Sequence, residues 1–185
     1  MRWDQLFADL EAQAAALDRA DRAGQVDERT RGEVGALALL DRLRAAIGAP
    51  VRLQVAGGLA VAGTVHRVGP DWVLLDEEGG REAVVVSARL LRVRGLPRYS
   101  AVPGSLGVVE SRLGLRHVLR GIARDRSSVR VHLVDGSVLD ATIDRVGDDF
   151  VEVAAHPAGE ARRRSEVREI EAVPLAAITV VRRGA

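Results

Sequence analysis

Two stretches near the N-terminus place apolar residues at helical spacing. The first runs from Trp3 to Ala23 and ends before Gly24, a residue that commonly stops helices. The second begins near Asp27, a residue that caps helices, and ends at Gly48. An apolar stripe on one face with polar residues elsewhere is typical of an amphipathic helix. The pattern therefore predicts a helical N-terminal region over residues 1–47.

From residue 51 the spacing of apolar residues changes to two. Val51, Leu53 and Val55 alternate with polar residues, and further short runs of this kind follow. Glycine pairs and other turn residues separate the runs, which favours hairpins. The pattern predicts five short strands, at residues 51–55, 59–65, 72–75, 83–86 and 90–93.

Helical spacing returns in the middle of the chain. Residues 97–104 contain two prolines and are predicted to be a linker, and residues 108–125 again place apolar residues at helical spacing. Arginines recur every fourth residue along this third helix and follow a different face from the apolar residues. They are Arg112, Arg116, Arg120 and Arg124.

The strand region occurs twice in the chain. With an offset of 78 residues, nine of the 26 positions from 51 to 76 are identical in the second copy, and apolar positions keep their alternation. The second copy then carries extra residues, 156–169, before residues 173–181 align with 86–94. The sequence thus predicts a helical region over 1–47, a first β-domain over 48–96, a linker and helix over 97–126, and a second β-domain over 127–185.

A helix followed by five short strands, with glycines at the first turn and inside the second strand, is typical of a small, strongly bent β-barrel. The first copy resembles the Sm-like family, and Val93-Arg94-Gly95 is similar to the end of that family's second motif. The positions that fit the family's first motif are Val55, Gly58, Val61, Gly63, Val65 and Val68. The resemblance covers residues 37–96 and, more loosely, 108–184. It implies an α+β, mainly β fold of two tandem Sm-like, SH3-like barrels, each preceded by a helix, behind an N-terminal helical extension.

The resemblance also implies RNA binding and assembly of copies through edge strands, so that three chains could form a ring of six barrels. Arg94 matches an arginine that contacts a base in the family, and its counterpart in the second copy is Arg182 or Arg183, depending on the gap. Four further residues lie in or beside the corresponding loops, as one aspartate followed by one aromatic residue in each copy. They either contact the ligand, or have structural roles in which the aspartate stabilises the turn and the aromatic residue packs in the core. They are Asp71, Trp72, Asp149 and Phe150.

Composition changes this picture only in part. The chain is 47% hydrophobic and 29% charged, and its net charge of +1 gives no general nucleic-acid signal. All 27 basic residues are arginine, a pattern that codon usage in a GC-rich bacterial genome produces. The number of arginines is therefore no evidence of nucleic-acid binding, and only their positions in the chain are informative. Residues 101–126 carry five arginines and two acidic residues, a net charge of +3. Arginine placement therefore points to the third helix.

The sequence offers little for catalysis or for a membrane. Cysteine is absent, the four histidines lack metal-binding spacing, and no Gly-x-Ser-x-Gly elbow or phosphate loop occurs. We therefore expect no enzymatic activity, no cofactor and no metal. No apolar run approaches the roughly 18 residues of a membrane span, and the acidic N-terminus does not fit a signal peptide, so a cytoplasmic protein is expected.

Two functional hypotheses follow. In the first, the barrels bind RNA through loops at one end and through the basic helix. In the second, the protein is an interaction scaffold without nucleic-acid binding, whose N-terminal amphipathic helix contacts a protein partner. The positions at which the family pins a base hold Gly69 and Val73 in the first copy, and Gly147 and Val151 in the second, which favours the scaffold. The family resemblance outweighs this, so RNA binding is the leading hypothesis and the scaffold is the alternative. Both hypotheses expect a homo-oligomer.

Overall fold

The structure, a computed structural model, describes residues 35–102, 110–155 and 169–183. The helix predicted over Trp3–Ala23 lies outside these residues, and so does most of the second predicted helix. The described elements from Leu39 onward belong to one compact unit, Leu39–Ala185. Its helices are α2 (Leu39–Ala45) and α3 (Leu115–Asp125), together with short 3-10 turns.

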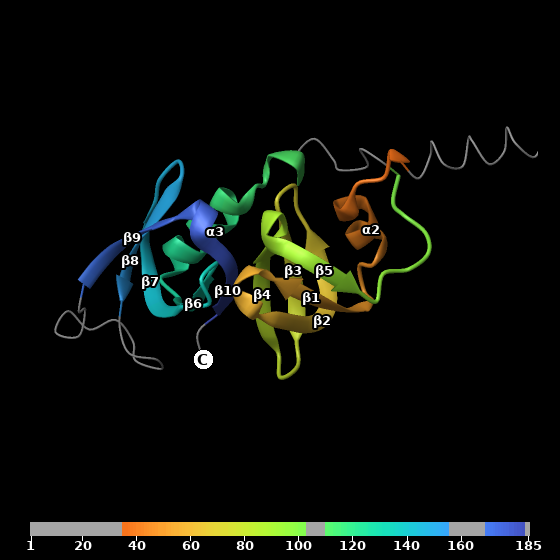
Figure 1. The fold of residues 1–185 in the computed structure, drawn as a ribbon. Coiled ribbons are helices and arrows are strands. Elements are labelled where there is room, and N and C mark those ends of the chain that lie inside the picture. The colour runs from red at the N-terminus through yellow and green to blue at the C-terminus, as the bar shows by residue number, and fades with distance from the viewer. Residues whose placement is uncertain (1–34, 103–109, 156–168, 184–185) are drawn as a thin grey trace, which may run out of the picture. The chain divides into compact units, whose positions relative to one another are not determined.

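The described part of the chain is rich in β-structure (Figure 1). The described residues form ten strands, and we call β1–β5 the first half and β6–β10 the second half. The strands of the first half are β1 (Pro50–Val55), β2 (Ala60–Val68), β3 (Trp72–Glu77), β4 (Arg81–Val86) and β5 (Leu90–Arg94). Those of the second half are β6 (Ser128–Leu133), β7 (Val138–Val146), β8 (Phe150–Ala155), β9 (Glu169–Pro174) and β10 (Ile178–Arg183). The five strands predicted between residues 51 and 93 are confirmed.

The prediction of two separate small barrels is wrong. All ten strands form one open antiparallel sheet with the order β5-β1-β2-β3-β4-β10-β6-β7-β8-β9. Within each half, the last strand pairs with the first, β5 with β1 and β10 with β6. Neither half closes on itself within the described residues, because β4 pairs with β10 instead of with β5, and β9 pairs with β8 but not with β10. Alternating hydrophobicity identifies strands but does not encode the partner of an edge strand, since ladder bonds join backbone groups.

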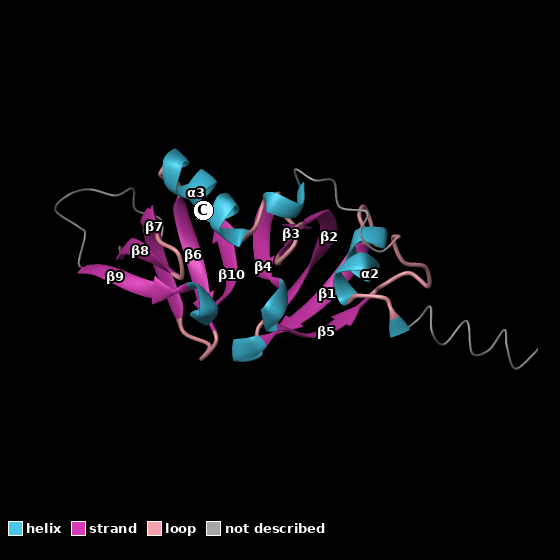
Figure 2. Cartoon of the chain, turned by 90° about the horizontal axis from the view of Figure 1, so that it is seen from above, coloured by secondary structure: helices cyan, strands magenta, loops and turns pink. Residues whose placement is uncertain are grey.

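The pairing of β4 with β10, which we call the seam, joins the two halves in the middle of the sheet (Figure 2). Val180 lies opposite Val85, Val181 opposite Val84, and Arg182 opposite Ala83. The backbones of the two halves also approach each other closely at Gly57. A Cβ on Gly57 would meet the carbonyl oxygen of Leu133 at 2.6 Å, so a glycine is required where the turn after β1 contacts the second half.

The two halves bury opposite faces of this sheet. Side chains of α2 and of the first half form one apolar cluster, and side chains of α3 and of the second half form another. Strand β4 contributes to both, because Ala83 and Val85 enter the first cluster while Val84 and Val86 enter the second. Val180 of β10 likewise enters the cluster of the first half. The seam strands are therefore apolar on both faces, as buried central strands are.

Two details of the sequence interpretation need correction. The helix predicted over 108–125 is shorter, because a 3-10 turn at Glu110–Arg112 precedes α3 and the chain is extended at Gly114. The end of the second copy also aligns with an offset of 88 residues and not 87. Trp72 pairs with Val86, and the equivalent Phe150 pairs with Pro174. A one-residue slip is easily made where two short apolar strands are aligned across an insertion.

Candidate nucleic-acid interface

Helix α3 presents a row of arginines to solvent. Leu115 and Leu119 are buried in the cluster of the second half, while Arg116, Arg120 and Arg124 are exposed. Spacing of four residues keeps their side chains on one side of a helix. Arg112 is exposed in the 3-10 turn just before α3. The structure thus places three of the four arginines that the sequence singled out on one exposed side of α3, and the fourth, Arg112, in the turn before it.

The arginines of this row differ in their partners. Arg116 is paired with the carboxylate of Asp148, in the turn between β7 and β8, and donates to the backbone carbonyl of Asp148 at 3.2 Å. Among the described residues, no ion-pair partner is found for Arg120 or Arg124. Asp125, the acidic residue at the end of the helix, lies on the side that faces the sheet. Positive charge on this face is therefore concentrated at Arg120 and Arg124.

Two predicted loop residues hold the start of α3 in place. The backbone N–H of Leu115 donates to the carboxylate Oδ1 of Asp71 at 2.8 Å, so Asp71 takes up one of the unpaired N–H groups at the helix N-terminus. Trp72 is 5% exposed, and its indole N–H donates to the carbonyl of Leu113 at 2.7 Å. Both residues serve the fold, and Trp72 does not offer a free ring face to a base.

The equivalent residues of the second half are open to solvent. Asp149 is exposed, and its backbone carbonyl accepts from the N–H of Leu175 at 2.7 Å. Phe150 is 36% exposed. Its ring lies against Gly147, where a Cβ would meet ring atoms at 2.5 Å, which explains the glycine at this position. Of the two aromatic residues singled out by the sequence, Phe150 is thus the one that is exposed on the surface.

The remaining predicted arginines lie on separate elements. Arg94 is exposed on the edge strand β5, directly opposite Arg52 of β1. Arg182 is its equivalent on β10, because it lies opposite Arg130 in the same register. Arg183, exposed at the end of β10, lies opposite Val129. The alternative between Arg182 and Arg183 as the counterpart of Arg94 is thus decided in favour of Arg182.

Arg182 is committed to the seam. Its Nε and Nη2 atoms donate to the two carboxylate oxygens of Glu77 at 2.8 and 2.9 Å, a bidentate pair that joins β10 to β3 of the other half. Its Nη1 lies 2.8 Å from Nε2 of His132 on β6. Burial, followed by the positive charges of Arg182 and Arg130, lowers the pKa of His132. A neutral His132 accepts the hydrogen bond from Arg182.

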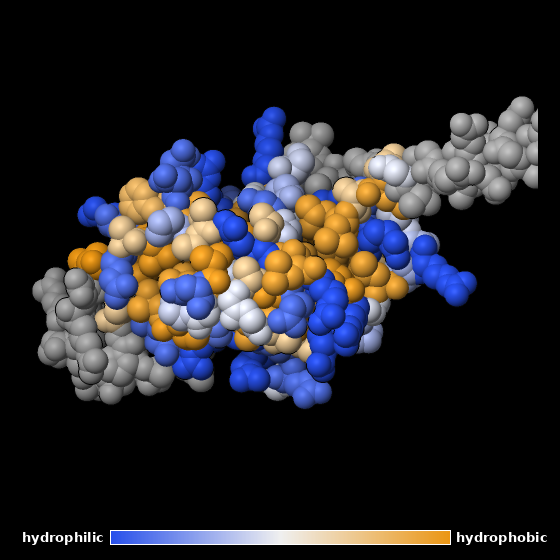
Figure 3. Space-filling view, viewed as in Figure 1, coloured by the Kyte–Doolittle hydropathy of each residue, from blue (hydrophilic) through white to orange (hydrophobic). Residues whose placement is uncertain are grey.

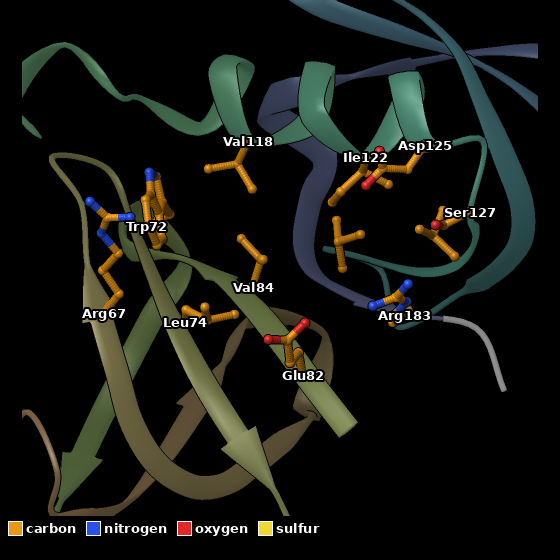
Figure 4. Close-up of a pocket in the computed structure, with 12 residues that line it drawn as sticks. Arg67, Trp72, Leu74, Glu82, Val84, Val118, Ile122, Asp125, Ser127 and Arg183 are labelled. Carbon is orange, nitrogen blue, oxygen red and sulfur yellow. The ribbon is translucent and has the colours of Figure 1, made fainter. Parts of the chain in front are cut away.

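A cavity of about 240 Å³ lies beneath α3, on the side of the helix facing the sheet (Figure 4). Val118 and Ile122 of α3 face Leu74 and Val84 of the first half across it. Charged side chains also line it, and these are Arg67, Glu82, Asp125 and Arg183. Sequence reasoning missed this cavity because its lining comes from both halves and from α3, and no local pattern connects those segments. Its size is below the roughly 300 Å³ of typical small-molecule sites.

Two further kinds of feature, a metal-binding cluster and a membrane-spanning helix, are not found in the described residues. No group of three or more histidine, cysteine, aspartate or glutamate side chains in ranges 35–102, 110–155 and 169–183 is arranged to hold a metal ion. None of the helices in the described part of the chain has the length and apolar character needed to span a bilayer.

Comparisons with protein-family models, with curated proteins and with solved structures find no match to this chain. The resemblance to the Sm-like family therefore stays a prediction. What the structure defines is a β-rich chain with one open ten-stranded sheet and an arginine-bearing helix.

Proposed function

We propose that this protein binds nucleic acid, RNA in the first place, through the exposed arginine row of α3. The observation that carries the proposal is the exposure of Arg120 and Arg124 one helical turn apart, without an ion-pair partner among the described residues. Cations held on a rigid helix can neutralise successive phosphates along a strand, and this releases condensed counterions. Arg112 and Arg116 extend the row toward the start of the helix.

The proposed binding depends on charge and shape more than on base identity. Trp72 is buried and Arg182 is paired with Glu77, so neither is free to read a base. Contacts from arginine to phosphate position a protein on a strand but do not select a sequence. We therefore expect similar affinity for U-rich and mixed single strands, and a steep loss of affinity with salt.

Fluorescence anisotropy with labelled U-rich and mixed RNA oligonucleotides, over a range of salt concentrations, tests this proposal. The double variant Arg120→Glu, Arg124→Glu should weaken binding and reduce the slope of log K against log salt by about 2. The matched control is Arg81→Glu, Arg98→Glu, which makes the same change of net charge at exposed positions outside α3. Equal weakening by both pairs, or no measurable binding at low salt, would reject the α3 interface.

A second candidate function is a protein scaffold that does not bind nucleic acid. The open edges of the sheet favour it, because strand edges can accept strands of other chains. The N-terminal stripe that the sequence assigns to a protein partner lies outside the described residues. Purification without nuclease separates the two candidates, since nucleic acid that co-purifies with the wild type but not with the α3 variant favours the first.

A further inference from the structure

One end of the cavity beneath α3 is lined by apolar side chains. Trp72, Leu74 and Val84 come from the first half, and Val118 comes from α3 (Figure 4). The Trp72 ring is held in place, because its indole N–H donates to the carbonyl of Leu113. A rigid apolar wall of this kind is typical of a preformed small-molecule site.

Polar side chains gather toward the other end of the cavity. Asp125 is the last residue of α3, Ser127 lies just before β6, and Arg183 is the last residue of β10. Figure 4 shows Glu82 of β4 on the strand side of the cavity. Glu82, Asp125 and Arg183 are exposed, and no ion-pair partner is found for them among the described residues. Arg67, at the apolar end, already has an interaction within the chain. The polar end therefore opens to solvent and offers both signs of charge.

The volume limits the ligand to a small molecule. An apolar cavity of roughly 150 Å³ is large enough to bind benzene. At about 240 Å³, this cavity has room for a ring or a branched chain of that size, with polar groups at the open end. Apolar side chains also remain at the surface over the strands (Figure 3), so exposed apolar area alone does not distinguish a site. Enclosure together with charged groups at one end does.

We propose that this cavity binds a free α-amino acid with a branched aliphatic or aromatic side chain. Such a ligand carries its ammonium and carboxylate groups on one carbon, so both charges lie at one end of an otherwise apolar molecule. Arg183 donates to the carboxylate, and Asp125 accepts from the ammonium group, with Glu82 as a second acceptor. The ligand side chain packs against Trp72 and Val118.

The proposed ligand contacts segments that meet only in the folded chain. These are α3, β4 of the first half and β10 of the second. A ligand that binds the folded state alone stabilises it. The inference does not depend on the nucleic-acid proposal, because Val118 and Asp125 lie on the side of α3 that faces the sheet, away from the arginine row.

Titration calorimetry and tryptophan fluorescence of the full chain test the proposal. L-leucine and L-phenylalanine should each bind at one site per chain and raise the urea midpoint. Glycine, which has no apolar side chain, should bind at least about tenfold more weakly. In a Trp3→Phe variant, which leaves Trp72 as the only tryptophan, the emission should change along the same saturation curve.

Ligands that lack one charge test the polar contacts. Isoamylamine is leucine without its carboxylate, and isocaproate is leucine without its ammonium group, so each should bind about tenfold more weakly than leucine. Arg183→Gln should weaken the binding of leucine by about the same factor but should not weaken that of isoamylamine. Asp125→Asn should weaken the binding of leucine but not that of isocaproate.

The matched controls are Arg81→Gln and Glu78→Gln, which remove the same charges at exposed positions that do not line the cavity. Both should bind leucine like the wild type, and circular dichroism should show that every variant keeps its fold. No saturable binding of leucine or phenylalanine at millimolar concentrations, or binding that leaves the emission of Trp72 unchanged, would overturn the proposal. Variants at Arg183 and Asp125 that bind leucine as tightly as the controls would also overturn it.

Discussion

The two halves of the sheet have strands in the same order but different surroundings. In the first half, the outer side of β3 and β4 is covered by α3 and by the second half, so Trp72 and Val84 are 5% and 7% exposed. Their equivalents in the second half, Phe150 and Ala172, are exposed. The same place in a repeated strand pattern is therefore core in one half and surface in the other.

This difference follows from the order of the chain. Helix α3 comes after the first half and before the second, and its N-terminus is bonded to Asp71 and Trp72. No described segment follows the second half to cover Asp149 and Phe150 in the same way. The surroundings of the first half thus depend on α3 and on the second half. Three tests compare residues that differ in these surroundings.

The largest expected difference in stability between the two halves is at the equivalent aromatic residues, Trp72 and Phe150. Trp72→Ala should lower the free energy of unfolding by about 3–5 kcal/mol, because it removes a buried ring and leaves a cavity beside α3. Phe150→Ala should cost about 1 kcal/mol, since its ring is already partly in water. Urea denaturation of both variants measures the contrast. Similar losses would mean that the outer sides of the two halves are equally covered.

A smaller effect is expected at the equivalent arginines. Arg182→Ala leaves the carboxylate of Glu77 without its bidentate partner, and the Glu77 side chain is only 11% exposed. We expect a loss of about 2 kcal/mol. Arg94→Ala, at an exposed edge, should change stability by less than about 0.5 kcal/mol. Measurement in dilute solution keeps self-association out of the comparison, and a cost at Arg94 as large as that at Arg182 would contradict it.

The smallest expected effect is a dependence of the seam on pH. The pKa of His132 is lowered from its ordinary value of 6.5, so the folded protein takes up this proton less readily than the unfolded chain. Stability is therefore unaffected by His132 above about pH 6.5 and decreases as the pH falls from there toward the lowered pKa. Protonation places a positive charge against Arg182, although Glu77 and Asp140 oppose this.

Urea midpoints at about pH 7.5 and about pH 5.5 measure this dependence. The matched variant His132→Gln keeps a side chain that can accept from Arg182 but does not titrate, so its midpoint should fall less than that of the wild type. An equal fall in both proteins would assign the pH dependence to other groups.

Much of the local structure was available from the sequence. Period-two alternation located the strands of the first half, and the repeat with offset 78 located β6, β7 and β8. Glycines marked the turns after β1 and β3. The apolar pattern predicts a start of α3 that is too early, because apolar residues such as Val108 continue the helical spacing on the N-terminal side of Leu115. The division of the chain into domains 48–96 and 127–185 stays a prediction.

The candidate site was only partly accessible in this way. Spacing of four predicted that Arg116, Arg120 and Arg124 share a face, and the structure confirms that they are exposed together. The same spacing could not show that Asp148 pairs with Arg116, because Asp148 lies in a distant turn. The roles of Asp71 and Arg182 were equally hidden, since their partners, Leu115 and Glu77, are more than forty residues away.

The sequence by itself determined which residues form strands, which side of each strand is apolar, and where arginines gather. Those properties depend on side-chain chemistry and on the fixed period of the backbone, and both can be read locally. Only the tertiary structure decided that β4 joins β10, that one open sheet replaces two barrels, and that Trp72 is buried while Phe150 is exposed. The backbone groups of a strand can form hydrogen bonds with any other strand of suitable geometry. Packing between segments that are distant in the sequence therefore decides which strand pairs with an edge strand.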